Sequence, residues 1–167
     1  MARRFNRPIK KSPKSDPQRN LVYRMESEAI GARMYLTLTK RKIISLLKTL
    51  ARSYRVAPCV VRFSDMTDYA ASWQPPNVIT FGAKTTSRDL LTALHEFAHH
   101  LHYVIEPRLS QEAHGAEFMC CYMSVLDTAR FVPVEAMAAV CKKYKVRYIQ
   151  PRDMDGVDNL AKLIRGK

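Results

Sequence analysis

An HExxH sequence, His95 to His99, sets the strongest limit on how this chain can fold. The apolar residues around it recur at helical spacing: Leu90, Leu91, Leu94, Ala98 and Leu101. Thr86 and Asp89 match a capping box, which predicts a helix with Thr86 as N-cap that runs to about Tyr103. Residues four apart lie one turn apart on one face, so both imidazoles can reach a single metal ion.

Glu96 has the position of a general base in such a site. It lies about 100° around the helix from His95 and about 60° from His99. It can therefore flank a metal ion without binding it, and take a proton from water that the ion activates. Neutral imidazoles suit zinc, so the sequence predicts a zinc site that has one position open for water.

A third protein ligand is needed, and four nearby residues are candidates: His100, His102, Glu112 and His114. His100 lies about 140° around the helix from His95, and His102 lies roughly 10 Å further along the axis, as a groove or supporting residue. His114 follows a proline-containing loop at the start of the next expected helix, which can fold back over the first. Glu112 is the alternative, because a carboxylate can complete a His2Glu site.

The residues after His114 also carry expectations. Gly115 would let the backbone pack close to the metal-bearing helix. Glu117 lies one turn from His114, either as an acid that orients a metal ligand or as a solvated acid at a helix N-terminus.

These motifs resemble the SprT-like zinc metalloproteases, including the Spartan group that degrades proteins crosslinked to DNA. HExxH is followed, after residues 100–113, by His-Gly-x-Glu-Phe, and the matching residues are His95, Glu96, His99, His114, Gly115, Glu117 and Phe118. The resemblance spans about Leu21 to Leu126. It implies an α+β, zincin-like fold with a small sheet, zinc held by the three histidines, and Glu96 as general base. The chain lacks the paired cysteines of the zinc ribbon found in larger members.

Further elements follow from periodicity and breakers. We expect a helix over 40–54, strands over 59–63 and 77–81, a helix over about 111–126 and another from Pro133. Residues 146–149 are a candidate strand and 157–164 a candidate terminal helix. Trp73, before the second strand, is expected to be a half-buried core residue, or else to line a cleft or stack on a base.

Charge divides the chain of 167 residues, which carries a net charge of +13, into three parts. Residues 1–20 predict a basic flexible arm, 21–130 a near-neutral metalloprotease domain, and 131–167 a basic helical extension. Basic ends favour DNA or RNA through phosphate contacts. The arm residues assigned to that role are Arg3, Arg4, Arg7, Lys10, Lys11 and Lys14.

The cellular setting is predicted from what the chain lacks. Its four cysteines form no CxxC pair, which favours free thiols in a reducing cytoplasm. The sequence contains no run of 18 apolar residues, so it predicts no membrane span. We therefore expect a cytoplasmic protein, associated with a nucleoid or a phage.

The function predicted from sequence is a zinc-dependent endopeptidase that acts on proteins bound or crosslinked to nucleic acid. The strand around 78–81 would pair with an extended substrate at the edge of the sheet. One alternative is a nucleic-acid-associated structural or virion protein that retains a zinc site. Another is a metallopeptidase with a specific soluble substrate, whose arms bind an acidic protein.

Overall fold

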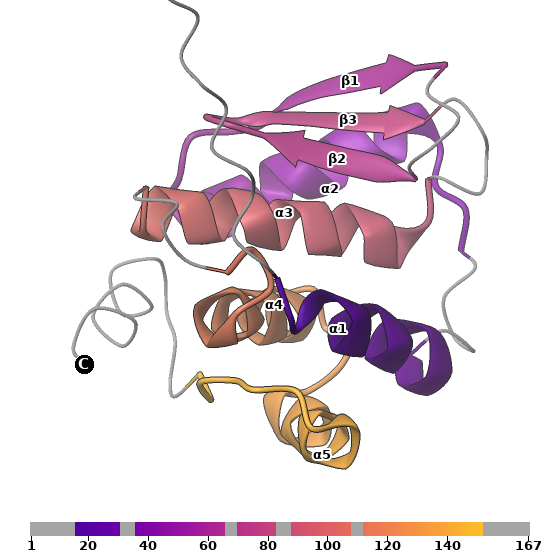
Figure 1. The fold of residues 1–167 in the computed structure, drawn as a ribbon. Helices are drawn as coiled ribbons and strands as arrows, with labels where there is room; N and C mark the ends of the chain where they lie inside the picture. The colour runs from indigo at the N-terminus through magenta and orange to yellow at the C-terminus, as the bar shows by residue number, and fades with distance from the viewer. Residues whose placement is uncertain (1–15, 31–35, 66–69, 83–87, 108–111, 152–167) are drawn as a thin grey trace, which may run out of the picture.

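The computed structural model describes residues 16–30, 36–65, 70–82, 88–107 and 112–151. Within these ranges the fold is α+β, with five α-helices and a three-stranded sheet, which confirms the predicted class (Figure 1). The helices are α1 (Arg19–Met25), α2 (Lys40–Ser53), α3 (Leu90–Ile105), α4 (Ala116–Thr128) and α5 (Val134–Tyr144), and α1 continues into a π-helical turn, η1 (Glu26–Ile30). The strands are β1 (Val60–Ser64), β2 (Ala71–Gln74) and β3 (Val78–Gly82).

The sheet places β3 between the other two strands. β1 runs parallel to β3, with Val60 opposite Val78, and β2 runs antiparallel to it, with Trp73 opposite Ile79. The two predicted strands are confirmed to within one residue, whereas β2 was not predicted. A substrate strand therefore cannot pair with residues 78–81, because both sides of β3 are already hydrogen-bonded within the sheet.

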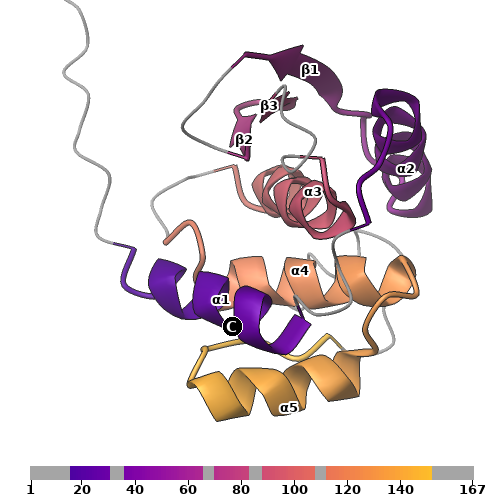
Figure 2. The ribbon, with the colours of Figure 1, turned by 90° about the vertical axis from the view of Figure 1, so that its right-hand side faces the viewer.

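Helix α3 lies at the centre of the molecule, between the sheet and α4 (Figures 1 and 2). Most of its apolar side chains from Ala93 to Ile105 are buried, as expected for a helix with neighbours on both sides, while Val104 near its end is exposed. Helix α2 packs Ile43, Leu47 and Leu50 into the same core. A rigid, enclosed helix thus carries the two motif histidines.

The start of α3 differs from the prediction. Its N-cap is Asp89, whose carboxylate accepts hydrogen bonds from the backbone N–H of Thr92 at 2.8 Å and from the Thr92 hydroxyl at 2.7 Å. Thr86 lies outside the described residues, and the prediction that it is the N-cap is wrong. Asp89 has the extended backbone that an N-cap requires, so it cannot also be the third residue of the helix.

Both predicted domain boundaries also need correction. Gln18, assigned to the flexible arm, is 2% exposed and donates hydrogen bonds to the carbonyls of His114 and Arg147. The folded part therefore includes residues 16–20. Helix α5, assigned to an extension, buries Met137 and Cys141 in the same core and packs against α1 and α4.

The C-terminal predictions have mixed outcomes. Residues 146–149 form no strand, because the backbone N–H of Arg147 donates to the Gln18 side chain instead of to a neighbouring strand. The expected helix over 157–164 lies outside the described residues. All four cysteines are free thiols, as predicted. None of the described helices is long and apolar enough to cross a membrane.

Candidate metal centre

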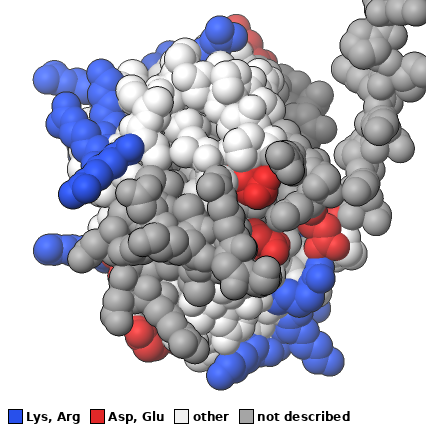
Figure 3. All heavy atoms as spheres, turned by 90° about the vertical axis from the view of Figure 1, so that its left-hand side faces the viewer, with Lys and Arg blue, Asp and Glu red and all other residues white. Residues whose placement is uncertain are grey.

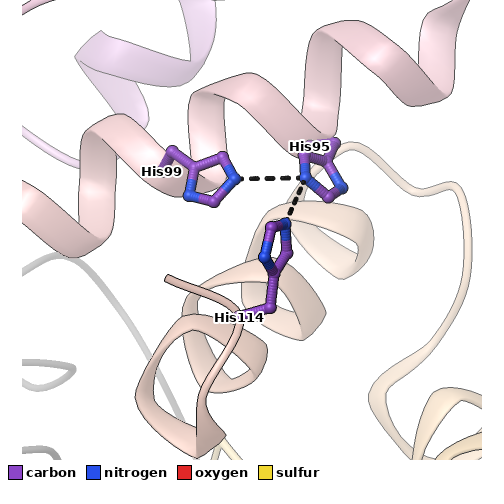
Figure 4. A group of neighbouring side chains, drawn as sticks. All are labelled: His95, His99 and His114. Atoms are coloured by element: carbon purple, nitrogen blue, oxygen red, sulfur yellow. Dashed lines mark hydrogen bonds between the residues drawn. The ribbon is translucent and has the colours of Figure 1, made fainter. Parts of the chain in front are cut away.

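Three histidines meet between α3 and the start of α4 (Figure 4). His95 and His99 project from one face of α3, and their Nε2 atoms are 3.1 Å apart. His114 lies just before α4, and its Nε2 is 3.2 Å from that of His95. One nitrogen from each of the three residues lies within 4.8 Å of the others. This confirms the prediction that His114 joins the motif histidines.

This cluster is supported by two carboxylates that no sequence motif had identified. Glu26 Oε1 lies 2.6 Å from Nδ1 of His95, and Asp16 Oδ2 lies 2.6 Å from Nδ1 of His114. An ionised carboxylate only accepts, so each Nδ1 must carry a hydrogen. Nε2 of each neutral ring then presents a lone pair. Such carboxylate–histidine pairs orient the ligands in many metal sites.

The donor arrangement fits a metal ion. With Nδ1–H committed to Glu26 and Asp16, the Nε2 atoms of His95 and His114 face each other, and either a shared hydrogen or a metal ion can join them. In a tetrahedral zinc site with Zn–N bonds of 2.0–2.1 Å, two nitrogens lie about 3.3 Å apart. The observed separations of 3.1 and 3.2 Å are close to that value.

The charge states of two of the three imidazoles suit ligation. Burial, together with the neighbouring imidazoles of His95 and His114, holds the pKa of His99 well below its usual range. Burial and His95 also lower the pKa of His114, although Asp16 opposes them. Burial alone would lower the pKa of His95, but Glu26 reverses this and raises it. His99 and His114 are thus neutral near pH 7, which is the form that binds metal.

Glu96 lies beside the three histidines but is not one of the grouped donors. It is 8% exposed, and its carboxylate accepts a hydrogen bond from the backbone N–H of Trp73 in β2. Burial raises its pKa, while His95 and the Trp73 N–H act in the opposite direction. A general base works best when its pKa approaches the working pH, so the direction of this shift favours that role.

Aromatic rings enclose the imidazoles. The centroid of the buried Phe118 ring lies 4.3 Å from that of His99, 5.0 Å from His114 and 5.2 Å from His95. Trp73 is half-buried, and its ring is stacked at 6.4 Å from His99. The ring centroid of Tyr23 lies 5.6 Å from that of His95. Tyr23 is 41% exposed, which places it at the solvent side of the centre. Trp73 therefore is half-buried, as predicted, and also borders the centre.

The remaining candidate ligands have other partners. His100 points away from His95, with its Nε2 3.0 Å from the carbonyl of Ala57, as predicted. His102 is buried, with its ring 6.5 Å from Phe118, and stays outside the cluster. Glu112 forms an ion pair with Arg147 instead of completing the metal site.

The expectation for Gly115 is wrong. A Cβ there would meet the carbonyl of Glu112 and the carboxylate of Glu117 at 3.3 Å, so the close approach is to its own loop and helix and not to α3. Asp16 and Glu26 supply carboxylates that contact imidazoles of the cluster.

No protein-family model matches this chain, and neither a curated protein nor a solved structure matches it. The six arm residues assigned to nucleic-acid contact lie outside the described residues. The geometry of the centre is therefore the basis for a functional assignment.

Proposed function

We propose that this chain is a zinc-dependent endopeptidase of the SprT-like type, with a zincin-like fold, that acts on proteins bound or crosslinked to nucleic acid. The observation that carries the proposal is the buried carboxylate of Glu96 beside three convergent histidine nitrogens. No fourth His, Cys, Asp or Glu of the described ranges joins that group. A closed structural zinc site has four protein ligands, whereas a catalytic one has three.

The chain's own residues supply the remaining chemistry. His95, His99 and His114 would hold a zinc ion, which would act as a Lewis acid, polarise a peptide carbonyl and lower the pKa of water. Glu96 accepts the proton of the attacking water at a carboxylate oxygen and then passes it to the departing amide nitrogen. The backbone N–H of Trp73 holds that carboxylate in place. The fully buried ring of Phe118, which packs against the imidazoles, limits the access of bulk water to them.

Strand β2 replaces residues 78–81 as the candidate platform for substrate. It pairs with β3 on one side, and within the described ranges no strand lies on its other side. Trp73 of this strand adjoins both Glu96 and His99. An extended peptide added to this edge would pass next to the centre, and it would be recognised through its backbone.

The test is cleavage of a basic DNA-binding protein, such as a histone, by the zinc-loaded full chain with and without duplex DNA. Glu96→Gln removes the base with little change in size, so cleavage should fall about 10²- to 10⁴-fold while zinc content stays the same. Glu28→Gln is the matched control, because Glu28 forms an exposed ion pair with Arg24. This control should cleave like the unmodified chain.

Three outcomes of this experiment distinguish the proposed function from its alternatives. Cleavage that depends on Glu96 and rises with DNA supports both the protease and its nucleic-acid partner. Cleavage that depends on Glu96 but ignores DNA retains the protease and removes the partner. If the folded, zinc-loaded protein cleaves nothing, the protease is wrong and the structural or virion alternative is favoured.

A further inference from the structure

The near-neutral centre of the chain consists of two segments of opposite charge. Residues 29–64 contain eight Lys or Arg and no Asp or Glu. Residues 65–140 contain nine Asp or Glu and only four Lys or Arg. The first segment includes α2 and β1, and the second includes α3 and α4 with the metal centre. The folded part therefore carries its own basic surface, separate from the basic ends.

Three cations of α2 form one line on its exposed face. By the helical period, Arg41, Lys48 and Arg52 lie within about 40° of one another and extend over about 17 Å of the helix axis. All three are exposed, and we call them the α2 basic stripe. Figure 3 shows Lys and Arg side chains gathered at upper left, on the side where α2 and β1 lie. Arg62 of β1 is also exposed, on the face of the sheet opposite to Val61 and Phe63, which pack against the core.

Within the described ranges, no acidic side chain forms an ion pair with any of the three residues of the stripe. Lys48 and Arg52 are like charges one turn apart, an arrangement that destabilises a helix. The first turn of α2 is also entirely basic up to Lys42, although the helix dipole disfavours cations there. Helix stability therefore does not account for this pattern.

The stripe lies away from the metal centre. His100, about 140° around α3 from His95, reaches the carbonyl of Ala57 in the segment that follows α2. The ring of Tyr54, directly after α2, lies 6.1 Å from that of Phe97. Phe97 is about 160° around α3 from both His95 and His99, so α2 packs on the side of α3 away from the histidines. A long polyanion on the stripe would leave the solvent side of the centre, where Tyr23 is exposed, free for a protein.

We propose that the α2 basic stripe binds the phosphate backbone of nucleic acid. One phosphate per 3.4 Å of each strand places several phosphates within its length of about 17 Å. This surface holds the chain on nucleic acid without covering the metal centre. The inference rests on the nucleic-acid partner of the proposed function, but it concerns binding and needs no proteolysis.

The experiment compares two triple variants of the full chain that remove the same charge. One is Arg41→Gln, Lys48→Gln and Arg52→Gln. The other is Lys142→Gln, Lys143→Gln and Lys145→Asn, at exposed cations at the end of α5, where Asn suits the left-handed backbone of residue 145. Binding to a labelled 20-base-pair DNA duplex and to a single-stranded RNA is measured by fluorescence anisotropy across a salt series.

The stripe variant should lose about tenfold in duplex affinity at 0.1 M salt, and its log–log salt slope should fall by about 2 to 3. The α5 variant removes the same charge from the basic C-terminal part of the chain, whose contribution to duplex binding should be smaller, and it should lose less than about threefold. Equal losses in the two variants, or no loss in the stripe variant, overturn the proposal. An unmodified chain that binds neither probe overturns the partner as well. Circular dichroism checks folding, and removing the repulsion between Lys48 and Arg52 should leave the melting temperature unchanged or raised.

Discussion

At the scale of single residues, the metal centre depends on which ring nitrogen of each histidine carries the hydrogen. Glu26 and Asp16 decide this for His95 and His114, because a carboxylate at 2.6 Å requires a hydrogen on Nδ1. Both acids come from the N-terminal part of the chain, outside the HExxH and His-Gly-x-Glu-Phe motifs. The affinity of the site for a metal ion therefore depends on these two carboxylates as well as on the three histidines.

Glu26→Gln should weaken zinc binding by about 10- to 100-fold, because the amide holds the His95 tautomer less firmly and lowers its basicity. Competition with a chromophoric zinc chelator measures the affinity. Glu28→Gln, two residues away and exposed, should bind zinc like the unmodified chain. Equal affinities for the two variants would show that Glu26 does not support the site.

Tyr54 makes a pH prediction at the same scale. Its hydroxyl hydrogen-bonds Ser124 and Thr128 at 2.7 and 2.8 Å, and burial raises its pKa to about 12. This pKa exceeds the unfolded value of 10, so its contribution is complete below pH 10 and is lost as pH rises toward 12. Tyr54→Phe should lower the free energy of unfolding by about 1 kcal/mol at pH 7. Between pH 10 and 12, the variant should lose about 2 kcal/mol less than the unmodified chain. Urea unfolding at each pH measures both effects, and parallel pH curves would contradict the assignment.

At the scale of elements, the capping of α3 determines how firmly the motif histidines are held. Asp89→Ala removes two acceptors at the N-terminus of this helix and should lower the free energy of unfolding by about 1 kcal/mol. Thr86→Ala tests the cap that the sequence pattern favoured, and it should leave the stability of α3 unchanged. Chemical denaturation of both variants decides between the two caps. A larger effect at Thr86 would reverse our assignment.

At the scale of the whole molecule, the metal centre joins parts of the chain that are distant in sequence. Asp16 and Glu26 enter from the N-terminal segment, and Gln18 ties that segment to the His114 carbonyl and to Arg147. Metal binding should therefore stabilise the N-terminal segment as well as the motif.

Chelation should lower the melting temperature of the zinc-loaded chain. Zinc at one hundred times its dissociation constant contributes about 2.7 kcal/mol, which corresponds to about 5–10 °C for a protein of this size. Amide hydrogen exchange should rise more in α1 than in α2, because α1 adjoins the centre and α2 packs on the other side of α3. Uniform exchange on metal removal would contradict this coupling.

The sequence patterns predicted the parts of the site that depend on local geometry. His95 and His99 were predicted on one helix face because their spacing of four matches the helical period. His114 needed more than periodicity, and it was favoured because a turn between two helices can bring it back over the first. Strand β2 was missed because its four residues, Ala-Ser-Trp-Gln, are too short to show a clear alternation.

The sequence by itself determined the α+β class, the helix that carries the HExxH residues, and the identity of three histidines able to converge. Only the tertiary structure decided which carboxylates support them, since Glu26 and Asp16 lie 69 and 98 residues from their partners. It also decided that β3 is central and that residues 16–20 are folded. Periodicity records how successive residues face the core, whereas contacts between distant segments depend on how whole elements pack, and no local pattern records that packing.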